Sequence, residues 1–358
     1  MGMGAYNTSI DLIDRFKMSV QEILSASARP DAALAHIAPL DHLTVLEARG
    51  ADTIEFLQGQ LTQDVKKLGD ADARLAGYCT AKGRLLASAI VWRAQPDPAD
   101  PVPRVLALVD ASIAQALQKR LSMFVLRAKV KLAATPLRVA GVWRGTDAAA
   151  LQAAAGGLLP AAPWSRADLP DATWIAAPAA DASPRWWWIG TDDALQRLGT
   201  ALGAPAQAGL AQAWRAADIA SGLPWITAPT QDLFVPQMVN LELIGGVSFT
   251  KGCYPGQEVV ARSHYLGKLK RRMFAGHVAG GQPDPQALAG ADVFQEGDEQ
   301  PCGRIVNAAR EGGGVAILYE SSLAAAQGQA PLHAGSPAGP IIQPRALPYA
   351  LSDDTRSA

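Results

Sequence analysis

Hydrophobic and polar positions alternate in the first part of the chain in a way that predicts a strand followed by a short helix. Residues 42–48 alternate between polar and apolar side chains, as a half-buried strand does. Asp52 comes next and is a typical helix cap, and the apolar Ile54, Phe56 and Leu57 after it fit one face of a helix. The pattern therefore predicts a β–α pair here.

A polar turn and a β-hairpin are expected next. Residues 58–64 are polar and end the helix in a turn. Residues 74–93 have the composition of a hairpin, with arms at 78–80 and 85–92 and a turn at 81–83 that ends on glycine.

One order of elements, a strand, a polar cap and a helix, occurs twice. The two copies are residues 104–121, with Asp110 as the cap, and residues 185–202, with Thr191-Asp192 as the polar cap. This repetition predicts two copies of one α+β unit around a shared core. The second strand carries three consecutive tryptophans, of which Trp187 must point away from its neighbours because strand side chains alternate. We interpret these rings as core side chains, with ligand stacking as the alternative.

The other segments are assigned from composition and spacing. Residues 7–25 have apolar positions near helical spacing and predict a surface helix on an N-terminal arm. Residues 148–182 are rich in Ala, Pro and Gly and predict a loop, whereas 214–222 predict a helix that contains Asp218 and ends on glycine. After residue 271, short strands and glycine-rich turns predict a small β-barrel.

Composition and charge limit the classes of function. The chain has 358 residues, enough for two or three domains, and is 49% hydrophobic and 18% charged with a net charge of −1. This balance gives no reason to expect direct binding of nucleic acid or a membrane. The first thirty residues do not have the pattern of a signal peptide, and no apolar run is long enough to span a membrane. We therefore expect a cytoplasmic protein.

The cysteine content excludes two kinds of site. Cys79, Cys253 and Cys302 are too few and too scattered for a disulfide framework, and no pair of them has metal-ligand spacing. We expect no metal site of the chain's own. Cys79 and Cys302 are most simply structural.

The strongest candidate site is the octapeptide 251–258, Lys-Gly-Cys-Tyr-Pro-Gly-Gln-Glu. It lies between an apolar run, 241–249, that we predict to be a strand, and a predicted helix, 257–265, closed by Gly267. The thiol of Cys253 should face the positive end of this helix and the Lys251 ammonium, and both favour the thiolate. Cys253 should then be the most reactive cysteine; the alternative is a structural turn with an inert thiol.

The octapeptide resembles the signature of the folate-binding YgfZ family, which is related to the T protein of the glycine cleavage system. Similar stretches lie at 56–65, 77–84 and 234–241, and the resemblance covers roughly residues 40–318 in the right order. It implies an α+β protein with a folate-binding body like that of the T protein, made of two related α+β units, and a small C-terminal β-barrel.

The resemblance also implies a division of the chain into domains. The predicted parts are an N-terminal arm (1–38), a folate-binding α+β domain that carries the octapeptide (39–132 and 205–268), a second α+β domain (133–204), the barrel (269–350) and a tail (351–358).

The function implied is a tetrahydrofolate-binding accessory protein that supports assembly or repair of iron–sulfur clusters in client enzymes, including tRNA-modifying ones. Cys253 would be the essential thiol, and Lys251 would tune it. The residues expected to contact folate or shape its site are Gln58, Gln60, Asp64, Asp218, Tyr254, Gln257, Glu258 and Arg262. The partners expected are folate and, transiently, the iron–sulfur client proteins.

Three details within this resemblance stay open. Asp218 either replaces a glutamate that holds the pterin in the T protein, or that contact is lost. Arg262 can pair with Glu258 four residues earlier on the helix. The basic run at 268–272 is either a solvated face or a site for a phosphate or the glutamate tail of a folate.

One departure from the T protein weighs against catalysis. That enzyme has a catalytic aspartate just after the glycine equivalent to Gly83, but here Leu86, Ala87 and Ser88 occupy this region, and no Asp or Glu lies between Tyr78 and Arg93. Loss of an acid or base costs orders of magnitude in rate. The alternative function, a folate-dependent aminomethyl transferase, is therefore disfavoured. An RNA-binding module is disfavoured by the near-neutral charge.

Overall fold

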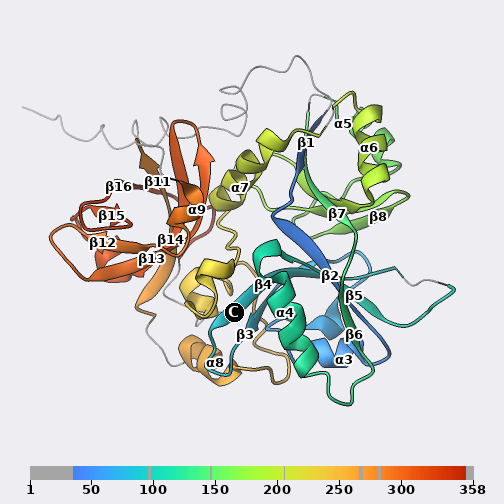
Figure 1. Ribbon diagram of the computed structural model, residues 1–358, viewed down its shortest axis with the longest axis horizontal. Coiled ribbons are helices and arrows are strands. Elements are labelled where there is room, and N and C mark those ends of the chain that lie inside the picture. Colours follow the sequence, from blue (N-terminus) through green and yellow to red (C-terminus); the bar gives the residue numbers. More distant parts are fainter. Residues whose placement is uncertain are drawn as a thin grey trace, which may run out of the picture.

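The computed structural model describes residues 35–351, except 96–97, 146, 205, 266–268 and 281–283. Two five-stranded antiparallel sheets lie beside a closed six-stranded barrel (Figure 1). The expected α+β body with a C-terminal barrel is confirmed. The helix predicted at 7–25 lies outside the described residues, and the domain boundaries stay predictions.

The first sheet has the strand order β3-β4-β5-β2-β6. Its strands are β2 (Leu43–Arg49), β3 (Arg74–Cys79), β4 (Leu85–Arg93), β5 (Arg104–Asp110) and β6 (Lys131–Ala134). Helices α3 (Thr53–Gln58) and α4 (Ala111–Met123) cover one face and bury their apolar side chains there. The strand, hairpin and helices predicted for this region are all present.

The second sheet has the order β1-β7-β10-β9-β8. Its strands are β1 (Ala35–Pro39), β7 (Arg138–Arg144), β8 (Arg166–Leu169), β9 (Ala172–Ala176) and β10 (Arg185–Gly190). Helices α5 (Ala148–Ala155) and α6 (Asp192–Ala201) cover its outer face. Strand for strand, β7 to β10 correspond to β2 to β5, so the two sheets share one topology and the predicted duplication is confirmed.

The edge strands are exchanged between the two units. The strand β1 leads directly into β2 of the other sheet, and β6 leads into β7. One hydrophobic cluster accordingly contains side chains from both sheets and from the barrel, among them Leu108, Trp187 and Met273. Trp186 and Trp188 belong to the cluster on the opposite face of their sheet. The predicted core role of the three tryptophans is therefore confirmed.

Two predictions of local structure were wrong. Residues 148–182 are not a loop, because they contain α5, β8 and β9. The alanine run forms α5, since alanine has the highest helix propensity and Asp147 caps the first turn by accepting hydrogen bonds from the N–H groups of Ala149 and Ala150. Residues 241–249 form turns rather than a strand: Asn240 is left-handed (φ 56°), and the N–H of Gly246 donates to the carbonyl of Leu241.

The helix caps were partly predicted. Asp110 accepts a hydrogen bond from the N–H of Ser112, and Thr191 accepts one from Ala194, as caps do. Asp52 stands at the expected position, but its carboxylate accepts from the N–H of Lys129 at 2.7 Å instead of capping α3.

The barrel closes in the order β11-β14-β13-β12-β15-β16. Its strands are β11 (Arg271–Ala279), β12 (Asp292–Gln295), β13 (Pro301–Glu311), β14 (Gly314–Ser322), β15 (Leu332–Ala334) and β16 (Ile341–Arg345), with short helices α9 (Pro285–Leu288) and α10 (Leu323–Ala326). Helix α7 (Ala211–Ala220) packs on β13 and β14. Within the described residues, no helix is long and apolar enough to cross a membrane.

Candidate functional site

The octapeptide forms a turn that packs against the hairpin turn of the first sheet. Gly256 has φ +81°, and a Cβ atom there would lie 2.4 Å from the carbonyl oxygen of Thr80. Gly83 has φ +74°, and its Cβ would lie 2.9 Å from that of Val259. Both conformations suit glycine, and both contacts leave no room for a side chain. Helix α8 (Gln257–Tyr265), which was predicted, starts directly after this contact.

Cys253 is exposed on this turn, whereas Cys79 is buried and Cys302 is intermediate. The other glycine of the octapeptide, Gly252, has no heavy atom within 4 Å of the position where its Cβ would be. The space in front of residues 252–253 is therefore open. The predicted high reactivity of Cys253 stays a prediction.

Lys251 is buried and connects the octapeptide to the end of α3. Its ammonium donates to the carbonyls of Gln58 and Leu61, the latter at 2.5 Å, and lies 5.0 Å from the centre of the Tyr254 ring. Burial lowers the pKa of Lys251 to about 8, although the negative charges of Asp64 and Cys253 act in the opposite direction. These bonds give Lys251 an anchoring role; the predicted tuning of the thiol stays a prediction.

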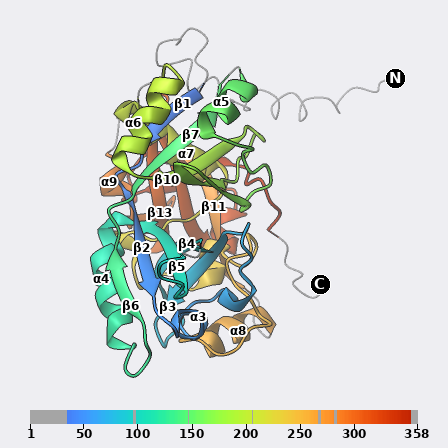
Figure 2. The same ribbon diagram turned by 90° about the vertical axis from the view of Figure 1, so that its right-hand side faces the viewer.

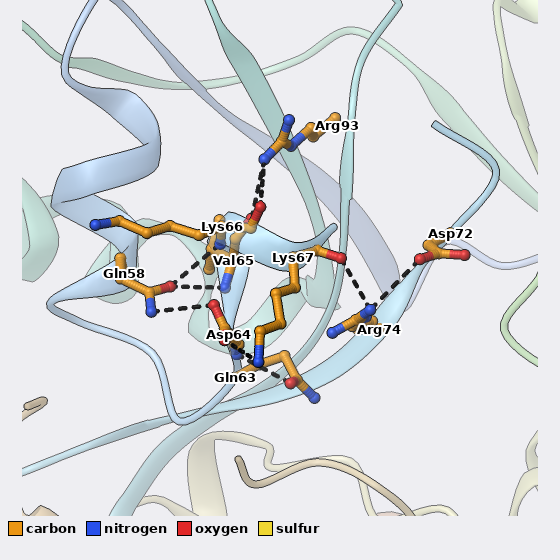
Figure 3. A network of polar contacts seen from close by, with 9 residues as sticks. All are labelled: Gln58, Gln63, Asp64, Val65, Lys66, Lys67, Asp72, Arg74 and Arg93. Carbon is orange, nitrogen blue, oxygen red and sulfur yellow. Dashed lines mark hydrogen bonds and ion pairs between the residues drawn. The ribbon is translucent and has the colours of Figure 1, made fainter. Parts of the chain in front are cut away.

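The turn at 58–64 is held by its own polar side chains (Figure 3). The amide of Gln58 donates to Asp64 at 3.1 Å and accepts from the N–H of Val65 at 2.8 Å. Burial alone would raise the pKa of Asp64, but the hydrogen bond from Gln58 and the nearby Lys67 ammonium, at 3.4 Å, hold this pKa below its usual value. The Oε1 atom of Gln60 is buried and has no hydrogen-bond partner among the described residues.

Sequence reasoning missed two buried side chains that join this turn to residues 241–249. Thr62 donates to the carbonyl of Gly246 at 2.6 Å and accepts from the N–H of Gly77 at 2.7 Å. The amide of Gln63 donates to the carbonyls of Gly245 and Leu75. A run of polar residues next to a helix end suggests solvent exposure, so only their contacts identify them as internal.

An open cavity of about 500 Å³ lies beside Gln63. Its lining residues are Gln63, Asp72, Ala73, Arg74, Leu75, Ala162, Pro163, Trp164, Ser165, Ile244 and Gly245. Trp164 has φ +69°, a conformation that costs energy for a non-glycine residue and that occurs preferentially at functional sites. Arg74 donates to the carbonyl of Lys67 at 2.9 Å and lies 3.5 Å from Asp72 (Figure 3). The cavity therefore combines an aromatic wall with a cation.

The remaining predicted residues of the octapeptide and α8 differ in their surroundings. Tyr254 is buried, and burial raises its pKa above the usual value. Glu258 and Arg262 are exposed and form the expected pair, at 2.7 Å. Gln257 is partly buried at the start of α8. None of these three α8 residues lines the cavity.

Asp218 lies apart from the octapeptide. Its helix, α7, lies in both views between the end that carries α5 and α6 and the end that carries α3 and α8 (Figures 1 and 2). One oxygen of the Asp218 carboxylate lies 2.7 Å from Arg185, and the other accepts from the indole N–H of Trp225 at 2.9 Å. Burial raises its pKa. The oxygen beside Arg185 makes no hydrogen bond among the described residues, and contact of Asp218 with folate stays a prediction.

Two further groups have structural partners. In the basic run, Arg271 pairs with Glu320 and Arg272 with Glu242, so neither guanidinium is a simple solvated charge. Ser88, in the region where the T protein has its acid, donates to the carbonyl of Pro224 and accepts from the N–H of Ile226. No cluster of three metal-ligating side chains occurs among the residues the structure describes.

Comparison with known proteins gives relatives of the whole chain. A tRNA-modifying protein YgfZ from Edwardsiella ictaluri is 34% identical over 258 residues, 69% of this chain and 74% of that one. One from Yersinia enterocolitica is 28% identical over 94% of this chain and 98% of that one. No family model matches. The crystal structure of glycine cleavage system aminomethyltransferase T from Bartonella henselae shares the fold, with a TM-score of 0.68 at 16% identity over 93% of this chain and 90% of that one.

Proposed function

The chain belongs to the YgfZ family, whose named members are tRNA-modifying proteins, and on this premise we propose that it is a tetrahydrofolate-binding accessory protein. It supports assembly or repair of iron–sulfur clusters in client enzymes, tRNA-modifying enzymes among them. The observation that carries the proposal is the exposed thiol of Cys253 on a turn that Lys251 and Gly256 hold in place. A thiol presented in this way can meet a cluster or its ligands on another protein.

The cavity beside Gln63 suits a folate. The pyrimidine ring of a reduced folate is flat, and the tail of the folate ends in carboxylates. Trp164 offers a ring surface and Arg74 a guanidinium, and the volume lies in the range of small-molecule sites. In this proposal Gln58 and Asp64 act indirectly, because they hold the turn that carries Gln63.

The transferase alternative has less support at the residue level. Ser88 is engaged on both sides by backbone groups of residues 224–226, and Leu86 and Ala87 offer no proton donor or acceptor. General acid–base catalysis needs such a group within hydrogen-bond reach. The shared fold with an aminomethyltransferase therefore does not carry its chemistry to this chain.

Thermal unfolding with tetrahydrofolate tests the folate site. A ligand that prefers the native state stabilises it by mass action, about 2.7 kcal/mol at a hundred times the dissociation constant. We expect the folate to raise the Tm of the wild type and to raise that of Arg74→Gln much less. Arg138→Gln, at an exposed arginine outside the cavity, is the matched control and should respond like the wild type. A full response of Arg74→Gln would remove the cavity from the proposal.

Complementation tests the role of the thiol separately. In cells that lack this protein, activity of an iron–sulfur tRNA-modifying enzyme should be restored by the wild type and by Cys302→Ala but not by Cys253→Ala. Cys253→Ala loses only a small exposed side chain, so its Tm should stay close to that of the wild type. Full restoration by Cys253→Ala would refute the role assigned to this thiol.

A further inference from the structure

An apolar tip with exposed side chains follows α4. Met123, Phe124 and Leu126 are 59%, 45% and 88% exposed, and they account for three of the seven large hydrophobic side chains that are exposed among the described residues. Leu126 also has φ +45°, in the left-handed region that a branched residue avoids. We call residues 123–126 the α4 tip. Its conformation and its exposure both cost free energy.

Positive charge predominates around the α4 tip, although the carboxylate of Asp52 accepts a hydrogen bond from the backbone N–H of Lys129. Lys119, Arg127, Lys129 and Lys131 are exposed, and none has an ion-pair partner in the described part of the chain. No Asp or Glu occurs between Asp110 and Asp147, although the whole chain has slightly more acidic than basic residues. An apolar centre with a charged rim is the usual anatomy of a protein interface.

The α4 tip and the Cys253 turn lie at the same end of the molecule. The loop between α4 and β6 and the helix α8 are both at the bottom in two perpendicular views, on opposite sides of that end (Figures 1 and 2). Helix α8, which follows Cys253 directly, adds two exposed apolar side chains, Val259 (37%) and Tyr265 (63%). Five of the seven exposed large hydrophobic side chains therefore belong to this end.

We propose that the α4 tip is a docking surface for an acidic protein, which inserts Leu126 and Met123 into an apolar pocket and is thereby held at the end of the molecule that carries Cys253. The basic rim selects an acidic partner by charge complementarity and speeds the encounter. The exposed Glu55 and Glu258 at the same end would be repelled by an anionic membrane, whereas a protein can accommodate them.

Photo-crosslinking in cells tests the surface. A photoreactive phenylalanine analogue replaces Leu126 in one full-length variant, Val259 in a second and Leu158 in a third. Leu158 is the matched control, because it is apolar and 79% exposed but follows α5 at the opposite end. We expect one acidic protein to be captured from positions 126 and 259 and not from 158. Reversing two rim charges, Arg127→Glu with Lys129→Glu, should lower the yield from position 126 by about tenfold or more.

Several results would overturn the proposal. These are nuclease-sensitive or lipid adducts at position 126, equal capture from position 158, an unchanged yield after the charge reversal, and no adduct in cells where the protein is active. The outcome is independent of the folate site, since Leu126→Asp should keep the wild-type Tm and its response to tetrahydrofolate. If that response were absent from the wild type as well, the proposed function would fail while the docking surface could still be judged from the adducts.

Discussion

Cys253 and Cys79 differ in access to solvent and in the environment of the sulfur. Burial raises the pKa of Cys79 to about 12 and also raises that of Cys302, and both shifts disfavour the reactive thiolate. Cys253 is exposed beside a helix start. At neutral pH, iodoacetamide should therefore modify Cys253 first, Cys302 more slowly and Cys79 only on unfolding, as peptide mass spectrometry over time would show. Equal rates for Cys253 and Cys302 would contradict this.

Lys251 should matter more for stability than an exposed lysine does. Lys251→Met removes the donor to two carbonyls at the end of α3 and leaves them without a partner, which costs about 1–3 kcal/mol. Lys66→Met is the control, because Lys66 forms an exposed pair with Glu55 that is worth roughly 0–1 kcal/mol. Urea unfolding of the three proteins measures the difference. Equal losses in the two variants would show that Lys251 is not an anchor.

The pH dependence of stability follows from the same lysine. Its pKa is about 8 in the folded protein, below the ordinary 10.5, so the unfolded chain binds more protons between these values. The stabilisation linked to this shift is therefore present above pH 10.5 and is lost as pH falls to about 8. We expect the wild type to gain stability relative to Lys251→Met over this window, by on the order of 3 kcal/mol at most. A flat difference between the two urea midpoints would argue against the shift.

The contact between the hairpin turn and the start of α8 depends on two glycines. Gly256→Ala would place a methyl group 2.4 Å from a backbone oxygen at φ +81°, and we expect a loss of roughly 1–3 kcal/mol and a lower Tm. Gly252→Ala, three residues before Pro255, is the matched control, because a Cβ there meets nothing within 4 Å. Its Tm should be unchanged. A stable Gly256→Ala variant would mean that the turn can shift without harm.

Helices were predicted best where the residue that marks the start of the helix forms hydrogen bonds with backbone close to it in the sequence. Asp110 and Thr191 mark their helices because a cap bonds to backbone two or three residues away. The strand predicted at 241–249 is absent, although apolar side chains of this segment do contact the core. The backbone turns here instead, and its carbonyl groups accept hydrogen bonds from Thr62 and Gln63, which lie in another part of the chain. The hydrophobic pattern of a sequence indicates which residues are buried, but it does not indicate which groups form hydrogen bonds with the backbone.

The sequence singled out the octapeptide with Lys251 and Cys253 as the candidate site, and the roles of these residues stay predictions. The sequence did not indicate the strained backbone of Trp164 or the cavity beside Arg74. Tertiary contacts determine both the φ angle of a non-glycine residue and the approach of β3 to residues 162–165. Asp218 looked like a free carboxylate, since its partner Arg185 lies 33 positions earlier in the chain.

The arrangement of the whole molecule depends on contacts between the two units and the barrel. Each sheet takes its outer strand, β1 or β6, from a segment that continues directly into the other sheet, so neither unit is complete when the chain is cut between them. Helix α7 extends this connection, because it packs on β13 and β14 and carries Asp218 to Arg185 at the start of β10. The Arg185–Asp218 pair therefore joins the second sheet to the helix that supports the barrel.

This buried pair allows a prediction that separates a structural role from folate binding. Asp218→Ala should cost about 3–5 kcal/mol, because it leaves the Arg185 guanidinium buried without its counter-ion, whereas Asp218→Leu with Arg185→Met removes both charges and should recover most of the loss. Urea unfolding followed by tryptophan fluorescence measures both, since Trp214 and Trp225 contact the pair. The double variant should also keep the rise in Tm with tetrahydrofolate, because no residue of α7 lines the cavity that contains Arg74. A folded double variant that no longer responds to folate would instead place Asp218 at the ligand.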